Sequence, residues 1–395
     1  MDAWENAGKA DTDKLIQSRY QKYNGMGSSA DSWKNRRIGL ISPIFPFRGG
    51  ISQYSTQLLR ALKKICTVDT FSFKRLYPGF LYPGISQFEP FSEGKSEPEV
   101  LYSIDAVNPV SWIRIVRKFR AANEGLVIIP WWSIVHFPWT IIILWLLKLS
   151  DIPVLLICHN VADHDNTKNR SLLLWMLMRS NRLFLVHCEE CASEIRHYNP
   201  YADIRVIPIP IYDQYPRPIK KTDPQASLEL LFFGFVRPYK GLGILVEAMR
   251  ILKEDNIHLN IVGEWWQNDP DLRQKIKSDP RIRLIDRYVS DDEAGEFFSM
   301  ADAVILPYHS ATGSAVASLA VHYQKPVIYS RLPSLTEMAG KNALWGLSFD
   351  PENSGDLARA ICEIPEFFRK NSFPNQNLPD MSWNSMAKEI LEIEI

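Results

Sequence analysis

The sequence predicts an α/β protein built from two doubly wound parallel-sheet domains that face each other across a cleft. Its 395 residues are enough for two separate apolar cores. Short apolar runs alternate with helical periodicities along most of the chain, which is typical of parallel strands covered by helices. One stretch, IPIPIYDQYPRPIKKTDPQ, packs prolines and charges together without an apolar period and therefore indicates a linker between the domains.

The first domain is expected at residues 37–210, after a flexible polar leader at residues 1–36. Each expected strand is a short apolar run, and a helical periodicity separates most of them. These strands are Ile38–Ile44, Val68–Phe73, Leu126–Trp132, Val154–Cys158, Leu183–His187 and Ile204–Ile207.

Residues 126–147 contain no Asp, Glu, Lys or Arg and are long enough to raise the question of a membrane span. Pro130 and Pro138 argue against one continuous helix. The pattern favours a buried strand, a loop through Pro138 and a very apolar helix at about Thr140–Leu149. Only that helix is expected to reach a lipid surface.

The second domain is expected at residues 227–380, after a linker at residues 211–226. Its expected strands are Leu228–Phe233, Leu259–Val262, Ile282–Leu284, Ala303–Leu306 and Pro326–Tyr329. Ser290 and Glu293 have the spacing of a capping box at the start of a helix. Residues 381–395 are expected to form a last amphipathic helix that packs back towards the first domain.

Charge and cysteine content narrow the classes of function. Lys plus Arg and Asp plus Glu both number 45, so no overall positive field favours nucleic acid, and none is expected as a partner. Five cysteines in a large chain without a secretory signal favour a reducing, cytoplasmic location.

The segment LLFFGFVRPYKG, residues 230–241, is the strongest sign of a ligand site. A buried strand ends at Gly234, and Arg237 and Lys240 follow in the loop before the next helix. Open α/β sheets bind ligands at this edge, where helix N-termini also favour anions. We therefore expect a diphosphate at Arg237 and Lys240, although cations on a solvated loop are the plain alternative.

Three other segments are expected to reach the same cleft. Gly49 and Gly50 follow the first strand, where they allow a close approach of a ligand or merely a tight turn. His159 ends the strand VLLICHN and is a catalytic candidate or a structural hydrogen-bonding residue. Thr312, Gly313 and Ser314 stand at the start of a helix, whose free N–H groups can hold a second phosphate. The segment can also be a simple N-cap of this helix, and the two roles are compatible.

Several activities lack their usual motifs. The sequence contains no G-x-G-x-x-G after the first strand, no G-x-x-x-x-G-K-[ST] and no G-x-S-x-G. Asp163 and Asp165 form a D-x-D that can hold a metal, but such triplets are common and protein cations would make the metal redundant. We therefore expect no metal and no cofactor.

With these segments in place, the chain resembles GT-B glycosyltransferases, close to family 4 (group 1), over residues 37–395. The segments that carry the resemblance are FPFRGGISQYSTQLLRAL, LICHNV, FFGFVRPYKGLGILVEAM and ATGSAVASLAVHYQKPVIYSRLPSLTEMA. The family uses nucleoside diphosphate sugars and retains the configuration of the transferred sugar. The resemblance departs from the family at Ser310 and Ser318, which stand where a pair of glutamates is usual.

The resemblance also implies roles for individual residues. His159, Arg237 and Lys240 would be catalytic, with His159 beside the transferred sugar and the two cations on the diphosphate. The donor-binding residues would be Gly49, Gly50, Gly234, Gly263, Glu264, Tyr288, Val289, Thr312, Gly313, Ser314, Ser318 and Glu337.

The predicted function is a retaining glycosyl transfer from a nucleoside diphosphate sugar to a saccharide or lipid-linked acceptor in cell-surface polysaccharide or glycan synthesis. The expected location is the cytoplasm or the inner face of a membrane, touched through the apolar part of the first domain. A well-filled core of that domain is the alternative explanation of its apolar segments. A nucleotide-sugar-binding subunit without activity, suggested by Ser310 and Ser318, and a nucleotide-sugar epimerase on the same fold are the alternatives.

Overall fold

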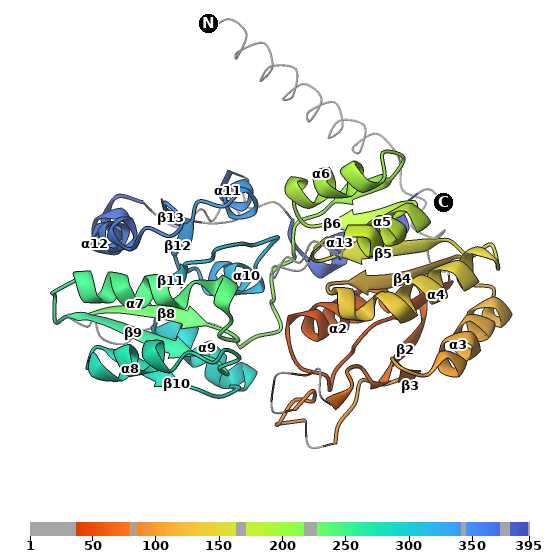
Figure 1. Cartoon of the computed structure of the whole chain (residues 1–395), viewed down its shortest axis with the longest axis horizontal. Coiled ribbons are helices and arrows are strands. Elements are labelled where there is room, and N and C mark those ends of the chain that lie inside the picture. The colour runs from red at the N-terminus through yellow and green to blue at the C-terminus, as the bar shows by residue number, and fades with distance from the viewer. Residues whose placement is uncertain are drawn as a thin grey trace, which may run out of the picture.

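The computed structural model describes residues 37–79, 82, 84, 86–92, 94–162, 171–216, 227–340, 345–371 and 380–393. Two parallel sheets, each covered by helices on both faces, lie side by side (Figure 1). The predicted fold class is thereby confirmed. The expected leader at residues 1–36, most of the linker and the D-x-D at residues 163–165 lie outside the described residues.

The first sheet has the strand order β3-β2-β1-β4-β5-β6-β7 and is parallel throughout. Its strands are β1 (Arg37–Ile41), β2 (Thr67–Arg75), β3 (Val100–Asp105), β4 (Leu126–Trp131), β5 (Val154–Cys158), β6 (Leu183–Val186) and β7 (Asp203–Val206). Its helices are α2 (Gly50–Leu62), α3 (Pro109–Ala122), α4 (Phe137–Lys148), α5 (Ser171–Ser180) and α6 (Glu189–Tyr198). Helices α3 to α6 share one apolar core on one face of the sheet, and α2 covers the other face.

The second sheet has the strand order β10-β9-β8-β11-β12-β13 and is also parallel throughout. Its strands are β8 (Leu228–Phe233), β9 (Ile257–Val262), β10 (Ile282–Ile285), β11 (Ala303–Leu306), β12 (Val327–Ser330) and β13 (Gly346–Phe349). The helices that follow β8 are α7 (Leu242–Ile251), α8 (Pro270–Ser278), α9 (Asp291–Met300), α10 (Ala315–His322), α11 (Pro333–Gly340), α12 (Ser354–Lys370) and α13 (Trp383–Leu391). The capping box predicted at Ser290 and Glu293 is confirmed at the start of α9.

The apolar stretch after β4 differs from its prediction in one respect. Helix α4 begins at Phe137, not at Thr140, because Pro138 occupies the first turn, where its missing N–H costs no hydrogen bond. The short 3₁₀ turn Ile134–His136 precedes it. In the ranges that the structure describes, every helix falls short of the length and apolar character that a membrane span requires.

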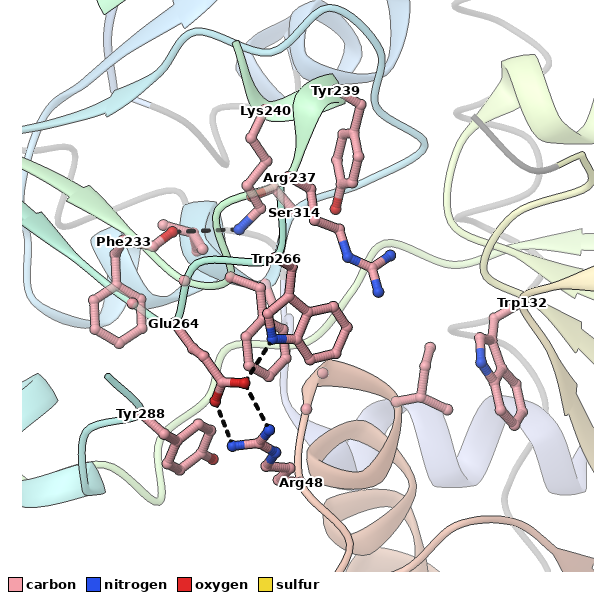
Figure 2. A pocket seen from close by; sticks show the side chains of 18 of the residues that line it. Arg48, Trp132, Phe233, Arg237, Tyr239, Lys240, Glu264, Trp266, Tyr288 and Ser314 are labelled. Atoms are coloured by element: carbon pink, nitrogen blue, oxygen red, sulfur yellow. Dashed lines mark hydrogen bonds and ion pairs between the residues drawn. The ribbon is translucent and has the colours of Figure 1, made fainter. Parts of the chain in front are cut away.

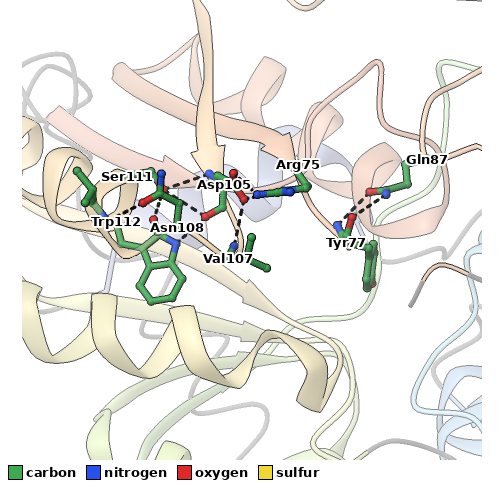
Figure 3. A network of polar contacts seen from close by, with 9 residues as sticks. Arg75, Tyr77, Gln87, Asp105, Val107, Asn108, Ser111 and Trp112 are labelled. Carbon is green, nitrogen blue, oxygen red and sulfur yellow. Dashed lines mark hydrogen bonds and ion pairs between the residues drawn. The ribbon is translucent and has the colours of Figure 1, made fainter. Parts of the chain in front are cut away.

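Strand β3 and helix α3 were not predicted, and a polar network fixes the turn between them (Figure 3). Arg75 on β2 donates two hydrogen bonds to the carboxylate of Asp105 at the end of β3. The Ser111 hydroxyl donates to Asn108 O at 2.7 Å, and the Trp112 indole donates to Asp105 O at 2.8 Å. These bonds hold the start of α3 against the edge strand.

The last helix of the chain lies on the first domain. Helix α13 packs against α2, and the Trp383 ring meets the rings of Tyr54 and Tyr212 edge-on at 5.1 Å and 5.3 Å. This contact belongs to an apolar cluster that also includes side chains of α9 and α10 in the second domain. An apolar core therefore joins the two domains at this part of their junction.

We expect Trp383→Ala to lower the free energy of unfolding by about 3 kcal/mol, because it removes a buried ring from this junction. Urea denaturation followed by circular dichroism measures the change. Trp145→Ala also removes an indole ring, but from a half-exposed position on α4, and it serves as the control. Its expected effect is a loss of less than about 1 kcal/mol in the free energy of unfolding. Equal losses in the two variants would contradict the assignment of the junction as a core.

Candidate functional site

A cleft of about 1170 Å³ lies between the two domains, at the carboxyl ends of strands from both sheets. The loops after β1, β2, β4 and β5 line it from the first domain, and the loops after β8, β9, β10 and β11 line it from the second. Its volume exceeds the usual range for one small molecule, which is about 300–1000 Å³. The cleft therefore has room for more than one small molecule.

Arg237 and Lys240 enter the cleft from the loop that joins β8 to α7 (Figure 2). The Arg237 guanidinium carbon lies 4.5 Å from the centre of the Trp266 ring. The Lys240 ammonium is buried and donates to the carbonyl of Phe233 at 3.3 Å. Within the part of the chain that the structure describes, neither cation forms an ion pair, so both can bind an anion in the cleft.

The glycine that ends β8 is required by this geometry. Gly234 has φ +97°, and a Cβ at this position would lie 2.7 Å from the Lys240 ammonium nitrogen. Gly263, which ends the neighbouring β9, has φ +148°, and its Cβ would lie 2.1 Å from Gly234 O. The positive φ disfavours a side chain at Gly234, and a Cβ at Gly263 would collide with the backbone of Gly234.

The charge of Lys240 is sensitive to its surroundings. Burial, and secondarily the charge of Arg237, lowers the pKa of Lys240 from 10.5 to about 7. A bound anion would favour the protonated form and raise this pKa again. An anion that enters the cleft would therefore favour uptake of a proton by Lys240.

Gly49 and Gly50 lie in the cleft on the side of the first domain. Gly49 precedes the first turn of α2 and has φ +99°, and a Cβ there would lie 3.4 Å from the Phe235 ring of the second domain. The start of α2 thus approaches the β8 loop closely. The first turn of α2, residues 50–53, is part of the cleft lining.

Thr312, Gly313 and Ser314 also line the cleft, at the start of α10. Ser314 is the N-cap of this helix and accepts a hydrogen bond from Ala317 N at 3.1 Å. The Thr312 hydroxyl lies 2.7 Å from His159 O and 2.5 Å from Asn160 Oδ1. Thr312 therefore joins the two domains at the floor of the cleft.

His159 lies behind the cleft lining, where the neighbouring residue Asn160 is exposed to the cleft instead. Its ring packs edge-on against Tyr54 at 4.5 Å, and it lies tilted against the ring of His187 at 5.1 Å. Burial, with a smaller contribution from His187, holds the pKa of His159 well below its usual range, so the imidazole is neutral. In this arrangement His159 positions Thr312 through its backbone carbonyl.

Two other predicted donor-binding residues also lie away from the cleft lining. Ser318 is fully buried within α10, and among the described residues its hydroxyl has no hydrogen-bonding partner. Glu337 on α11 accepts a hydrogen bond from the backbone N–H of Glu189, at the start of α6 in the first domain, at 2.9 Å. Glu337 thus links the domains at a second place.

Tyr288, Val289 and Glu264 line the cleft on the side of the second domain. Glu264 forms an ion pair with Arg48, which comes from the first domain and was not among the predicted site residues. Arg48 stands directly before Gly49 and Gly50 in the sequence. This position beside a glycine loop was the only feature of the sequence that could have marked Arg48 as a site residue.

Comparison with known proteins gives the class of protein to which this chain is similar. Residues 227–366 match the family described as glycosyl transferases group 1, which confirms the resemblance predicted from the sequence. The whole fold is that of GT-B glycosyltransferases. Sucrose-phosphate synthase from Thermosynechococcus elongatus aligns with a TM-score of 0.66 and 18% identity, covering 90% of this chain and 97% of that one.

HepE from Anabaena, solved in complex with UDP and glucose, aligns with a TM-score of 0.67 and 14% identity, covering 90% of this chain and 99% of that one. In sequence, the chain is similar to a GDP-mannose:glycolipid 4-beta-D-mannosyltransferase from Xanthomonas campestris pv. campestris. The two are 27% identical over 190 residues, which is 46% of this chain and 51% of the relative. The chain spans about half the length of the curated relatives it matches.

We expect the affinity for inorganic pyrophosphate to fall as the pH rises from 7 to 9, by up to tenfold per pH unit, because Lys240 must take up a proton to bind the anion. Isothermal titration calorimetry in buffers of constant ionic strength measures this slope. In Lys240→Arg the charge persists throughout this range, so the slope should disappear. An affinity of the unaltered protein that does not change with pH would exclude Lys240 as a ligand of the anion.

Proposed function

We propose that this protein is a glycosyltransferase that moves a sugar from a nucleoside diphosphate sugar to a glycolipid or saccharide acceptor. The observation that carries the proposal is the placement of Arg237 and Lys240, which have no ion pair among the described residues, across the cleft from Gly49 and Gly50. This arrangement suits a diphosphate held between the two domains. The matching family and the named relatives support the same reaction.

The proposed chemistry follows from where charge develops. As the bond between the sugar C1 and the diphosphate oxygen breaks, negative charge grows on the leaving diphosphate. Arg237, Lys240 and the N–H groups at the start of α10 stabilise that charge. The acceptor oxygen bonds to C1 and gives up its proton to the departing diphosphate, so no metal or cofactor is required in this scheme.

Retention of configuration is part of the proposal. The carboxylates among the described lining residues are Glu264, which is paired with Arg48, and Asp269, which caps helix α8. Neither is available as a nucleophile or as a general base. Attack of the acceptor oxygen on C1 from the same face as the leaving group needs neither a carboxylate nucleophile nor a general base. Such an attack retains the configuration.

GDP-mannose is the first donor to test, because the Xanthomonas relative is named for it. The name of that relative also specifies a β linkage, which transfer from an α-linked donor sugar forms by inversion at C1. The anomeric configuration of the product, measured by NMR, is therefore the test of retention. Inversion would overturn the stereochemical part of the proposal and leave the transfer itself in place.

The acceptor is proposed to reach the cleft from a lipid surface. Helices α3, α4 and α5 pack side by side on one face of the first sheet and contain no acidic residue (Figure 1). Exposed apolar side chains on and beside them are Val110, Ile113, Val135, Ile142, Trp145, Leu149, Leu172 and Trp175. Exposed cations on and beside them are Arg114, Arg117, Lys118, Arg120, Lys148, Arg179 and Arg182.

This α3–α5 surface has the chemistry of a contact with anionic lipid headgroups, since the apolar side chains can enter the interface while the cations meet the phosphates. Val135 belongs both to the surface and to the cleft lining. A lipid-linked saccharide on the membrane would thus have a short path to the cleft. We propose that the surface rests on the cytoplasmic face of a membrane, where the reaction serves polysaccharide or glycan synthesis.

We expect Arg237→Ala to lower the turnover number by on the order of 100-fold, because it removes a charge from the leaving group. Release of GDP from GDP-mannose, with a bacterial lipid extract as acceptor, measures turnover. Arg250→Ala removes an exposed arginine from α7 and should leave turnover unchanged. If Arg237→Ala turned over as fast as the unaltered protein, the proposed diphosphate site would be wrong.

We expect the protein to float at low salt with vesicles that contain phosphatidylglycerol. With vesicles of phosphatidylcholine alone, it should remain in the unbound fraction. Reversing two charges on α3, Arg114→Glu with Arg117→Glu, should weaken flotation at least tenfold. The matched control is Arg369→Glu with Lys370→Glu on α12, in the other domain. Equal flotation of both double variants would refute the α3–α5 surface as the contact.

A further inference from the structure

The ion pair between Arg48 and Glu264 is unusual for its burial and its geometry. The Arg48 side chain is 2% exposed and the Glu264 side chain 7%. Arg48 Nη1 donates to Glu264 Oε2 at 2.6 Å, and Nη2 donates to Oε1 at 3.0 Å, so the two groups meet as parallel forks. The pair lies in the cleft and joins the two domains (Figure 2).

Aromatic rings surround the guanidinium of Arg48. Its carbon lies 5.5 Å from the centre of the Tyr288 ring, 5.7 Å from that of Phe235 and 5.9 Å from that of Tyr82. The Trp266 indole stacks on Phe235 at 4.2 Å and donates to Glu264 Oε1 at 2.9 Å. The cleft thus holds an aromatic slot with an oriented carboxylate at one end.

A slot of this kind matches one nucleobase better than the others. Guanine presents two parallel donors, N1–H and the N2 amino group, in the same arrangement as the two N–H groups of a guanidinium. Uracil presents one N–H between two carbonyl oxygens, and adenine presents an amino group beside a ring nitrogen acceptor. Either base would place an acceptor against a carboxylate oxygen, which is repulsive.

We propose that Glu264 recognises the base of the donor, that this base is guanine, and that Arg48 occupies the same carboxylate until guanine replaces it. The inference rests on the proposed function, because it assumes a nucleoside diphosphate in the cleft. Stacking on the aromatic side chains would add to the binding of the planar base. The exchange substitutes one bidentate, charge-assisted contact of Glu264 for another.

The exchange also gives Arg48 a second role. Arg48 directly precedes Gly49 and Gly50, which lie in the cleft opposite the loop of Arg237 and Lys240. Once guanine holds Glu264, the freed guanidinium is close in sequence to the glycine loop expected at the diphosphate. Recognition of the base would therefore supply a third cation to the leaving group.

Calorimetric titration with GDP, IDP and UDP tests the inference. IDP lacks only the N2 amino group, so the unaltered protein should bind GDP about tenfold or more tightly than IDP, and UDP weakly. Glu264→Gln, which keeps the size of the side chain, should bring the three affinities within about threefold of each other. Glu296→Gln, on the exposed face of α9, is the matched control and should keep the preference for GDP.

Equal binding of GDP and IDP by the unaltered protein, or a preference for GDP that survives in Glu264→Gln, would overturn the inference. In both cases nucleotides still bind, so the proposed function stands and the ion pair is only a link between the domains. Failure of the unaltered protein to bind any of the three nucleotides would overturn the proposed function together with the inference. The comparison of GDP with IDP needs no variant, so misfolding of Glu264→Gln cannot mask the result.

Discussion

Parallel pairing of the strands is the constraint on which the rest of the molecule depends. In a parallel sheet every strand ends at the same edge, so every loop that leaves a strand's carboxyl end emerges there. Two such sheets joined by one linker bring two sets of loops face to face. Arg237 and Arg48, which are far apart in the chain, meet in one cleft for this reason. An antiparallel arrangement would send alternate loops to opposite edges.

The strands that were predicted correctly lie mostly in the interior of their sheets, because burial on both faces leaves a continuous apolar run. The strands that were missed, β3 and β13, are edge strands with exposed or half-buried positions. Strand β3 reads VLYSID and is held by its pairing with β2 and by the Arg75–Asp105 contact. Tertiary contacts of this kind leave no periodic pattern in the sequence.

The candidate site divides in a similar way. Arg237, Lys240, Gly49 and Thr312 line the cleft, and local signals, a strand end followed by a helix start, were enough to find them. Arg48 was missed because its partner Glu264 stands 216 residues away, and only the folded chain brings them together. The predicted position of His159 at a strand end is correct, but the direction of its side chain depends on Tyr54 and His187, which sequence position does not reveal.

The position of α13 has a consequence for how the protein folds while the ribosome synthesises it. Proteins are synthesised from the N-terminus, and domains usually fold as they emerge. Here the apolar face of α2, including Tyr54, is covered by residues 383–391, which are synthesised after the second domain. The first domain must therefore keep an uncovered apolar face until the whole second domain has been made.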